Sequence, residues 1–216
     1  MYVQEEPRAS DLAYALLRDM VVDLRLPPGA VVNEQQLTGE TGFGRMPVRE
    51  AVARLAADRF VTVVPRRGTY VTPLGLADVL GMFEAREAIE CGVAHLTARR
   101  ATPAQLEQLR ELADAADRVR SADEIEQHLH ADHAIHAHLA GVTGNAILQE
   151  SVDLLLQHNL RFWRSYWTTH EPRASDMLSH ADLVDAIASH EPEAAELAMR
   201  QHIGASRGLL QDAFRH

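Results

Sequence analysis

Four residues in the second half of the chain have the types and spacing of metal ligands. Asp132 and His136 are four residues apart in a helical pattern, so both side chains lie on one face of that helix. His180 begins another amphipathic segment, and His202 lies deep in the last helical pattern. One carboxylate and three imidazoles from three helices can form a closed metal site in a helical bundle. The alternative is that these are surface or boundary residues, as most histidines of amphipathic helices are.

Arginines in the first half of the chain form a second group of candidate functional residues. Gly42 and Gly44 break the helix that precedes them, and Pro47 suits the first turn of a new helix. Arg45 and Arg49 are four residues apart and therefore project from one face at the start of this new helix. Its buried face consists of apolar residues at helical spacing, namely Val48, Val52 and Leu55. Two guanidinium groups at an exposed helix start suit the DNA major groove, where arginine binds guanine edges or phosphates.

A basic hairpin follows the arginine helix. Residues 60–64 are mostly β-branched and predict a strand, and residues 69–71 predict a second short strand. The turn between them carries Arg66, Arg67 and Gly68. Such a wing can lie along the DNA backbone or the minor groove. Helices followed by a two-stranded basic hairpin predict a winged helix-turn-helix.

Apolar periodicity predicts the elements that position these groups. Before the arginine helix, residues 8–25 predict an amphipathic helix and residues 33–40 a short helix that Asn33 caps. After the wing, helical patterns cover nearly the whole chain, at 76–100, 103–120, 122–141, 145–168, 173–189 and 191–214. We therefore predict a mainly α chain of two domains: a winged helix-turn-helix with a two-stranded wing over residues 1–72, and an all-α ligand-binding bundle over residues 73–216.

The stretch from Pro28 to Val71 resembles the GntR family of bacterial transcription regulators. The resemblance is carried by GFGRMPVREAVARL at the arginine helix and by VPRRGTYV at the wing. The chain departs from the family pattern at two positions. Gly44 replaces the usual serine, which removes a helix cap of ~1 kcal/mol or less. Arg59 replaces the usual glycine, which predicts a strained or differently shaped helix exit.

The second half of the chain is similar to the ligand-binding domain of the FadR-type subgroup of the same family. The motifs are DHAIHAHLAGVTGN, which begins at Asp132, and SHADLVDAIASHEPEAAELAMRQHI, which begins at Ser179. The resemblance implies that Asp132, His136, His180 and His202 hold one divalent metal ion. Imidazole-rich ligation favours Zn, with Ni, Mn or Fe as alternatives. Because ligating imidazoles must be neutral, we expect metal affinity to fall as the pH drops through ~6.5.

Arg86 begins REAIECGVAHLTARR, which also follows the pattern of the subgroup. An arginine in a helix otherwise lined by small and apolar residues needs an anionic partner. One interpretation is an ion pair with Glu90 or another acid of the chain. The other is effector binding, in which Arg86 holds one carboxylate oxygen of a small organic acid while the metal holds another. Arg161 and Arg164, which neighbour four aromatic residues, are candidates to line the same cavity, although that aromatic cluster also suits a core or a dimer interface.

Charge is divided unevenly along the chain. The formal net charge is −10, and all 21 basic residues are arginines. Residues 1–72 contain equal numbers of arginines and acidic residues, so residues 73–216 carry the whole excess of negative charge. Local charge, rather than the total, decides whether a surface binds DNA. The absence of a membrane-spanning apolar run and of an apolar signal region, with a single cysteine, Cys91, expected in the core, predicts a cytoplasmic protein.

Together these features predict a metal-containing transcriptional regulator that binds palindromic operator DNA as a homodimer and responds to a small carboxylate metabolite. Repression is the commoner behaviour in the family. Two alternatives are a regulator whose effector is the metal itself, and a metal-dependent enzyme fused to a DNA-binding module. Three histidines and an aspartate could activate water. No HExxH-type base accompanies them, so we expect no enzymatic activity.

Overall fold

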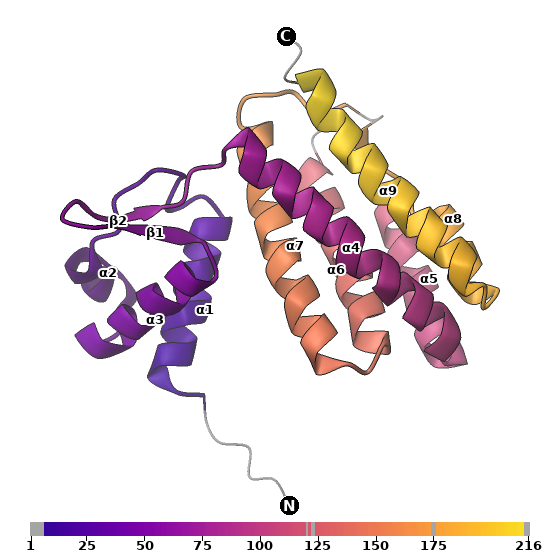
Figure 1. Ribbon diagram of the computed structural model, residues 1–216, viewed down its shortest axis with the longest axis horizontal. Coiled ribbons are helices and arrows are strands. Elements are labelled where there is room, and N and C mark those ends of the chain that lie inside the picture. The colour runs from indigo at the N-terminus through magenta and orange to yellow at the C-terminus, as the bar shows by residue number, and fades with distance from the viewer. Residues whose placement is uncertain (1–6, 120, 122–123, 174–175, 214–216) are drawn as a thin grey trace, which may run out of the picture. The chain divides into compact units, whose positions relative to one another are not determined.

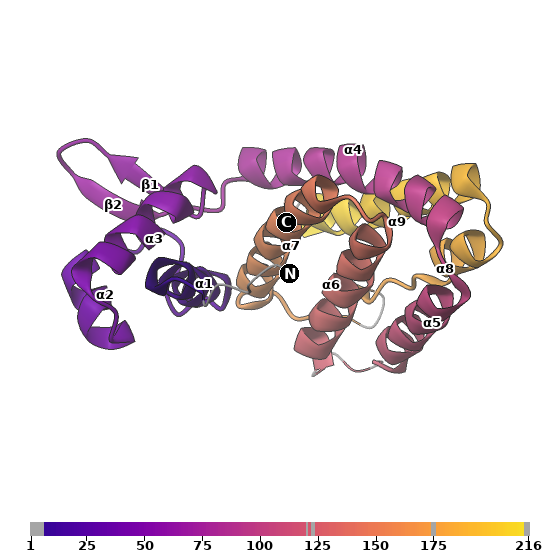
Figure 2. The same ribbon diagram turned by 90° about the horizontal axis from the view of Figure 1, so that it is seen from below.

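The structure is a computed structural model that describes residues 7–119, 121, 124–173 and 176–213. The chain forms two compact units, Met1–Gly75 and Leu76–His216, and each is described by itself. Predicted helix ends at residues 120, 122–123 and 214 lie outside the described residues. Figure 1 shows the order of the elements, and Figure 2 shows the same chain turned by 90°.

The first unit is a winged helix-turn-helix. Its elements are α1 (Ala9–Val22), α2 (Glu34–Thr41), α3 (Arg45–Ala57), β1 (Val61–Val64) and β2 (Gly68–Val71). The two strands are antiparallel, with Val61 opposite Val71 and Val64 opposite Gly68. This mainly α architecture with a two-stranded wing confirms the predicted fold class (Figure 1).

Local sequence explains where the helices of the first unit begin and end. The Asn33 side chain accepts hydrogen bonds from the backbone N–H groups of Gln35 and Gln36, at 3.0 and 3.2 Å, and so caps α2 as predicted. Gly42 ends α2 with a φ of 74°, a left-handed conformation that glycine adopts without a steric penalty. Gly44 precedes α3 without a side-chain cap, which confirms the consequence expected from the missing serine.

The core of the first unit lies between α1 and α3, where Leu17, Leu55 and Phe60 are fully buried. The exit from α3 passes through Arg59, which has a φ of 63°. A non-glycine residue in this left-handed region costs about 1 kcal/mol or more. The unusual arginine therefore adopts the backbone conformation for which glycine is better suited, so the helix exit carries local strain, as one of the two expectations had it.

The second unit is a bundle of helices. Its elements are α4 (Leu76–Arg100), α5 (Pro103–Arg118), α6 (Ile125–Val142), α7 (Ala146–Trp167), α8 (Ala181–Ala188) and α9 (Pro192–Ala213). Helix α4 packs along α9 and also contacts α6, α7 and α8 (Figure 2). Pro103 begins α5 at the predicted residue, and Pro192 begins α9 one residue after the predicted start. Within the described part of the chain, no helix is both long and apolar enough to span a membrane.

One predicted helix of the bundle is much shorter than expected. A helix was predicted over residues 173–189, but α8 begins only at Ala181. The Ser179 hydroxyl accepts a hydrogen bond from the Ala181 backbone N–H at 3.2 Å, which competes with helical pairing at this point. Residues 174 and 175 lie outside the described residues. The late start leaves His180 at the N-cap, where its side chain is completely buried.

Candidate metal centre and DNA-binding surface

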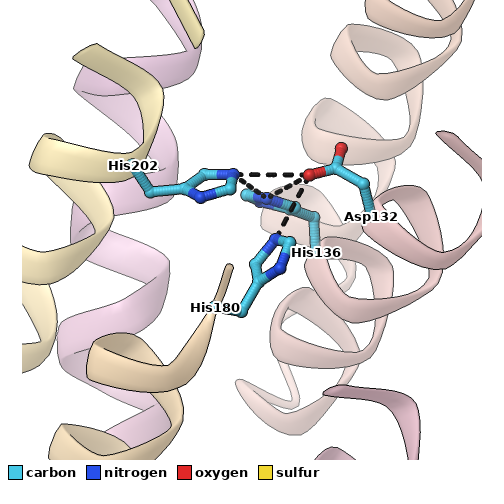
Figure 3. A group of neighbouring side chains, drawn as sticks. All are labelled: Asp132, His136, His180 and His202. Carbon is cyan, nitrogen blue, oxygen red and sulfur yellow. Dashed lines mark hydrogen bonds and ion pairs between the residues drawn. The ribbon is translucent and has the colours of Figure 1, made fainter. Parts of the chain in front are cut away.

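The bundle brings four potential metal ligands together, here called the ligand cluster: Asp132, His136, His180 and His202 (Figure 3). Asp132 Oδ1 lies 3.2 Å from His180 Nε2, 3.3 Å from His202 Nε2 and 3.6 Å from His136 Nε2. The Nε2 atoms of His136 and His202 are 3.4 Å apart. The four ligating atoms all lie within 4.8 Å of one another, so one ion could reach all of them.

The geometry and burial of the ligand cluster fit a metal ion. Zinc–nitrogen bonds of ~2.0–2.1 Å give a tetrahedron with edges of about 3.3 Å. The four separations given above range from 3.2 to 3.6 Å. Both ring nitrogens of His180 and Nδ1 of His202 are buried without a hydrogen-bond partner among the described residues. Such atoms are costly to bury unpaired, and a cation held by Nε2 atoms would compensate part of that cost.

Two side chains of α4, Glu90 and Arg86, support His136 of the ligand cluster. The Glu90 carboxylate on α4 forms a short hydrogen bond with His136 Nδ1, the ring nitrogen that faces away from Asp132. Arg86 donates from Nε to Glu90 Oε1 at 2.6 Å, and both side chains are about 1% exposed. A carboxylate that accepts the Nδ1–H of a histidine fixes the tautomer whose Nε2 can bind a metal.

These contacts shift the pKa values of the cluster in opposite directions. Burial lowers the pKa of His136, but the carboxylates of Glu90 and Asp132 outweigh burial and raise it to about 9. Burial lowers the pKa of His202 to about 4. Burial raises the pKa of Glu90, yet Arg86 and His136 together lower it to about 2. The raised pKa of His136 means that a metal would have to displace a proton from this ring at neutral pH.

Arg86 pairs within the chain. Its guanidinium is engaged by Glu90, the first of the two interpretations that the sequence allowed. Burial lowers the pKa of Arg86, while the Glu90 carboxylate raises it above its ordinary value. Arg86 does not line the cavity beside the ligand cluster. Arg86 contacts Glu90, and Glu90 contacts His136. Arg86 would therefore act on a bound metal only through these two side chains.

A cavity lies beside Asp132 within the bundle. Its lining residues are Ile125, His128, Leu129, Asp132, Trp163, Trp167, Asp176, Leu178, Ser206 and Leu209. The aromatic residues of α7 lie in two places, the core of the bundle and the wall of this cavity. Phe162 packs edge-on against Phe83 in the core, whereas Trp163 and Trp167, stacked at a centroid distance of 5.6 Å, also form cavity wall. Arg164 is directed to an ion pair with Glu126.

Two residues that the sequence did not single out contribute to this region. His128 is only 7% exposed and lines the cavity. The signal was its spacing, because His128 precedes Asp132 by one helical turn and shares a face with Asp132 and His136. Glu90 was considered only as a partner of Arg86, and no local pattern connects it to His136 across 46 residues.

The predicted DNA contacts of the first unit are all exposed. Arg45 and Arg49 lie in the first turns of α3, with Val48 buried between them. Arg66 and Arg67 lie in the turn between β1 and β2, and Gly68 begins β2 with a φ of 117°. A different α3 arginine, Arg54, is engaged within the unit: it binds Asp11 at 2.6 Å and lies 4.1 Å above the Tyr14 ring.

The winged helix-turn-helix followed by a separate helical unit is the architecture of a transcription regulator with a DNA-binding part and a second, all-helical part. The comparisons with known families agree. Residues 9–71 match the family of bacterial regulatory proteins named gntR, and residues 81–205 match the FCD domain. The chain belongs to the GntR family of DNA-binding transcription regulators and carries an FCD domain, a type of domain that often binds metal.

Several similar proteins are named as transcription regulators. An uncharacterized HTH-type transcriptional regulator in an unstable DNA locus of Streptomyces ambofaciens is 30% identical over 192 residues, which cover 89% of this chain and 80% of that protein. The HTH-type transcriptional repressor RspR of Escherichia coli strain K12 is 26% identical over 88% of this chain and 83% of its own length. The structure of E. coli McbR/YncC shares the fold, with a TM-score of 0.83 and 18% identity, covering 97% of this chain and all of that one. The family and these relatives confirm that the chain is a regulator and not an enzyme.

Proposed function

We propose that this protein is a metal-containing transcriptional repressor that responds to a small carboxylate. The observation that carries the proposal is the convergence of Asp132 and three histidines on one buried point, with Oδ1–Nε2 separations of 3.2 to 3.6 Å. The choice of repression follows RspR, a relative that is named a repressor. A homodimer that binds a palindromic operator is proposed because symmetric oligomers place two identical recognition helices on two half-sites.

The ligand cluster would hold one divalent metal, for which Zn is the first choice and Ni, Mn or Fe are alternatives. A bound metal would supply a Lewis-acidic position for an oxygen ligand. Glu90 keeps the Nδ1–H of His136 directed away from the cluster, and Arg86 holds the Glu90 carboxylate in place. We therefore assign Arg86 to the support of His136, in place of the direct effector contact that the sequence left open.

The effector would reach the metal from the cavity, which shares Asp132 with the ligand cluster. Because the ligands come from α6, α8 and α9, an effector that changes their packing changes the relative stability of two bundle conformations. If the two conformations place the DNA-binding units of a dimer at different spacings, they differ in operator affinity. The effector would then change the free energy of operator binding by as much as the operator changes the free energy of effector binding. Arg45 and Arg49 would contact the major groove, while Arg66, Arg67 and Gly68 would contact the backbone or minor groove.

The test starts from metal-loaded protein and an operator selected from a random duplex DNA library. Metal analysis should find about one divalent ion per chain, and sedimentation should give a dimer. His180→Ala should lose most of the metal, whereas His130→Ala, an exposed histidine of α6, should keep it. Operator binding should respond to an organic acid only when metal is present. If chelation alone switches operator binding and no acid has an effect, the metal itself is the effector; full metal occupancy in a His136→Ala, His180→Ala double variant would exclude the site.

A further inference from the structure

Helix α3 carries an exposed methionine, Met46, in its first turn. Met46 is 61% exposed, whereas the other large apolar residues of the helix, Val48, Val52 and Leu55, are at most 4% exposed. Among the described residues of α3, Met46 is therefore the one large apolar side chain that lies in solvent. Single exposed apolar residues are common on protein surfaces, so the position of Met46 on the helix decides whether it has a role.

Met46 occupies the outermost position of α3. The residues that α3 buries against the rest of the first unit are Val48, Ala51, Val52 and Leu55. At about 100° per residue, the mean direction of these four side chains lies about 170° around the helix from Met46. Ala53, about two turns further along, points in nearly the same direction as Met46 and is also exposed. The centre of the outward face of α3 is therefore apolar.

Charged side chains border this apolar centre. Arg45 and Arg49 are exposed on one side of Met46, and Glu50 is exposed on the other. In the DNA major groove, arginine binds the edge of guanine, and an apolar side chain contacts the C5-methyl group that thymine presents there. Met46 and Arg49 are about 4.5 Å apart along the helix axis, close to the base-pair spacing of about 3.4 Å. The outward face of α3 thus matches a sequence in which thymine lies next to guanine.

We propose that Met46 determines part of the operator specificity by contacting the C5-methyl group of a thymine, next to a guanine that Arg49 binds. The thioether and the methyl group both leave water in this contact, which favours thymine over cytosine at that position. The burial of one methyl group corresponds to about a fourfold change in the dissociation constant. This inference rests on the proposed function, because it requires that α3 lies in the major groove.

The test replaces the thymines of the selected operator, one at a time, by deoxyuridine, which pairs in the same way and lacks only the methyl group. Binding of the metal-loaded full-length protein to each duplex is measured by fluorescence anisotropy. We expect deoxyuridine to weaken binding about fourfold at one thymine and at its counterpart in the other half-site. The remaining thymines should tolerate the replacement.

A substitution of Met46 identifies the side chain responsible. Met46→Ala removes the thioether and keeps a residue of high helix propensity, so the thermal stability of the protein should not change. This variant should bind the thymine operator about fourfold more weakly than the wild type, and it should no longer distinguish thymine from deoxyuridine. The matched control is Leu12→Ala, which removes a 47% exposed apolar side chain from α1 and should preserve the fourfold discrimination.

The outcomes separate this inference from the proposed function. If no deoxyuridine weakens binding of the wild type, or if Met46→Ala shows the same loss as the wild type, the contact between Met46 and thymine is overturned. The placement of α3 in the major groove then still stands on the loss of affinity in Arg45→Ala and Arg49→Ala. If both arginine variants bind the operator like the wild type, the proposed DNA contacts of α3 fail, and the contact of Met46 fails with them.

Discussion

The pKa of His136 makes metal binding steeply dependent on pH. In the metal-free protein this pKa is about 9, because the carboxylates of Glu90 and Asp132 outweigh the effect of burial. A metal needs the neutral imidazole, so binding displaces one proton at any pH below 9. Apparent affinity then falls almost tenfold per pH unit, and the dissociation constant should rise roughly 80-fold between pH 8.5 and 6.5. An imidazole with an ordinary pKa would give a change of about twofold over the same range.

The assay is a zinc titration against a chelator of known affinity at several pH values. Calorimetry in two buffers of different ionisation enthalpy should count about one proton released per metal near pH 7.5. Glu90→Gln removes one of the two negative neighbours of His136, so the loss of metal affinity should begin at a lower pH. The substitution is combined with Arg86→Met, because Arg86 would otherwise be a buried arginine without an ionic partner. His130→Ala should reproduce the wild-type curve. A dissociation constant that stays flat from pH 8.5 to 7, with no proton released, would refute the electrostatic argument.

Further expected outcomes concern DNA binding and stability. Arg45→Ala and Arg49→Ala should each weaken operator binding by ~1–3 kcal/mol without changing the thermal stability of the bundle; wild-type titration curves for both would remove α3 from the interface. Arg66→Ala should reduce the slope of log affinity against log salt by about 1, and an unchanged slope would place the wing off the DNA. Saturating metal at 1,000 times its dissociation constant should stabilise the bundle by about 4 kcal/mol in chemical denaturation, an effect that His180→Ala should largely abolish. The free energy of unfolding of the metal-free protein should fall by up to roughly 3 kcal/mol as the pH rises from 6.5 through 9. The reason is that a raised pKa means that protonated His136 stabilises the fold, and this contribution disappears when the ring loses its proton.

Local sequence patterns were sufficient to predict the architecture, apart from the start of α8. Apolar spacing predicts where the helices lie, and caps such as Asn33 and breakers such as Gly42 predict their ends, because these signals act within a few residues. The winged helix followed from β-branched runs around a basic turn. The spacing of Asp132 and His136 also places two potential ligands on one face of α6 from sequence alone.

The start of α8 shows where local patterns failed. Periodicity extended the helix back to residue 173, but the chain between 176 and 180 is not α-helical, and His180 enters the ligand cluster from the N-cap. Packing determines this boundary, because burying the His180 side chain depends on Asp132 of α6, which lies 48 residues earlier in the chain. Helical periodicity near residue 180 carries no information on that contact, which only the family resemblance indicated.

The sequence by itself determined most of the helix bounds and the wing, since these depend on spacing within one element, and it indicated the candidate ligands through their resemblance to a family pattern. Only the tertiary structure decided that Arg86 pairs with Glu90, that Glu90 reaches His136, and that His128 lines a cavity. Helical periodicity states which residues share a face, but not which faces meet. The pKa of His136 depends on the distances to carboxylates on two helices, so its shift exists only once α4 and α6 have packed together.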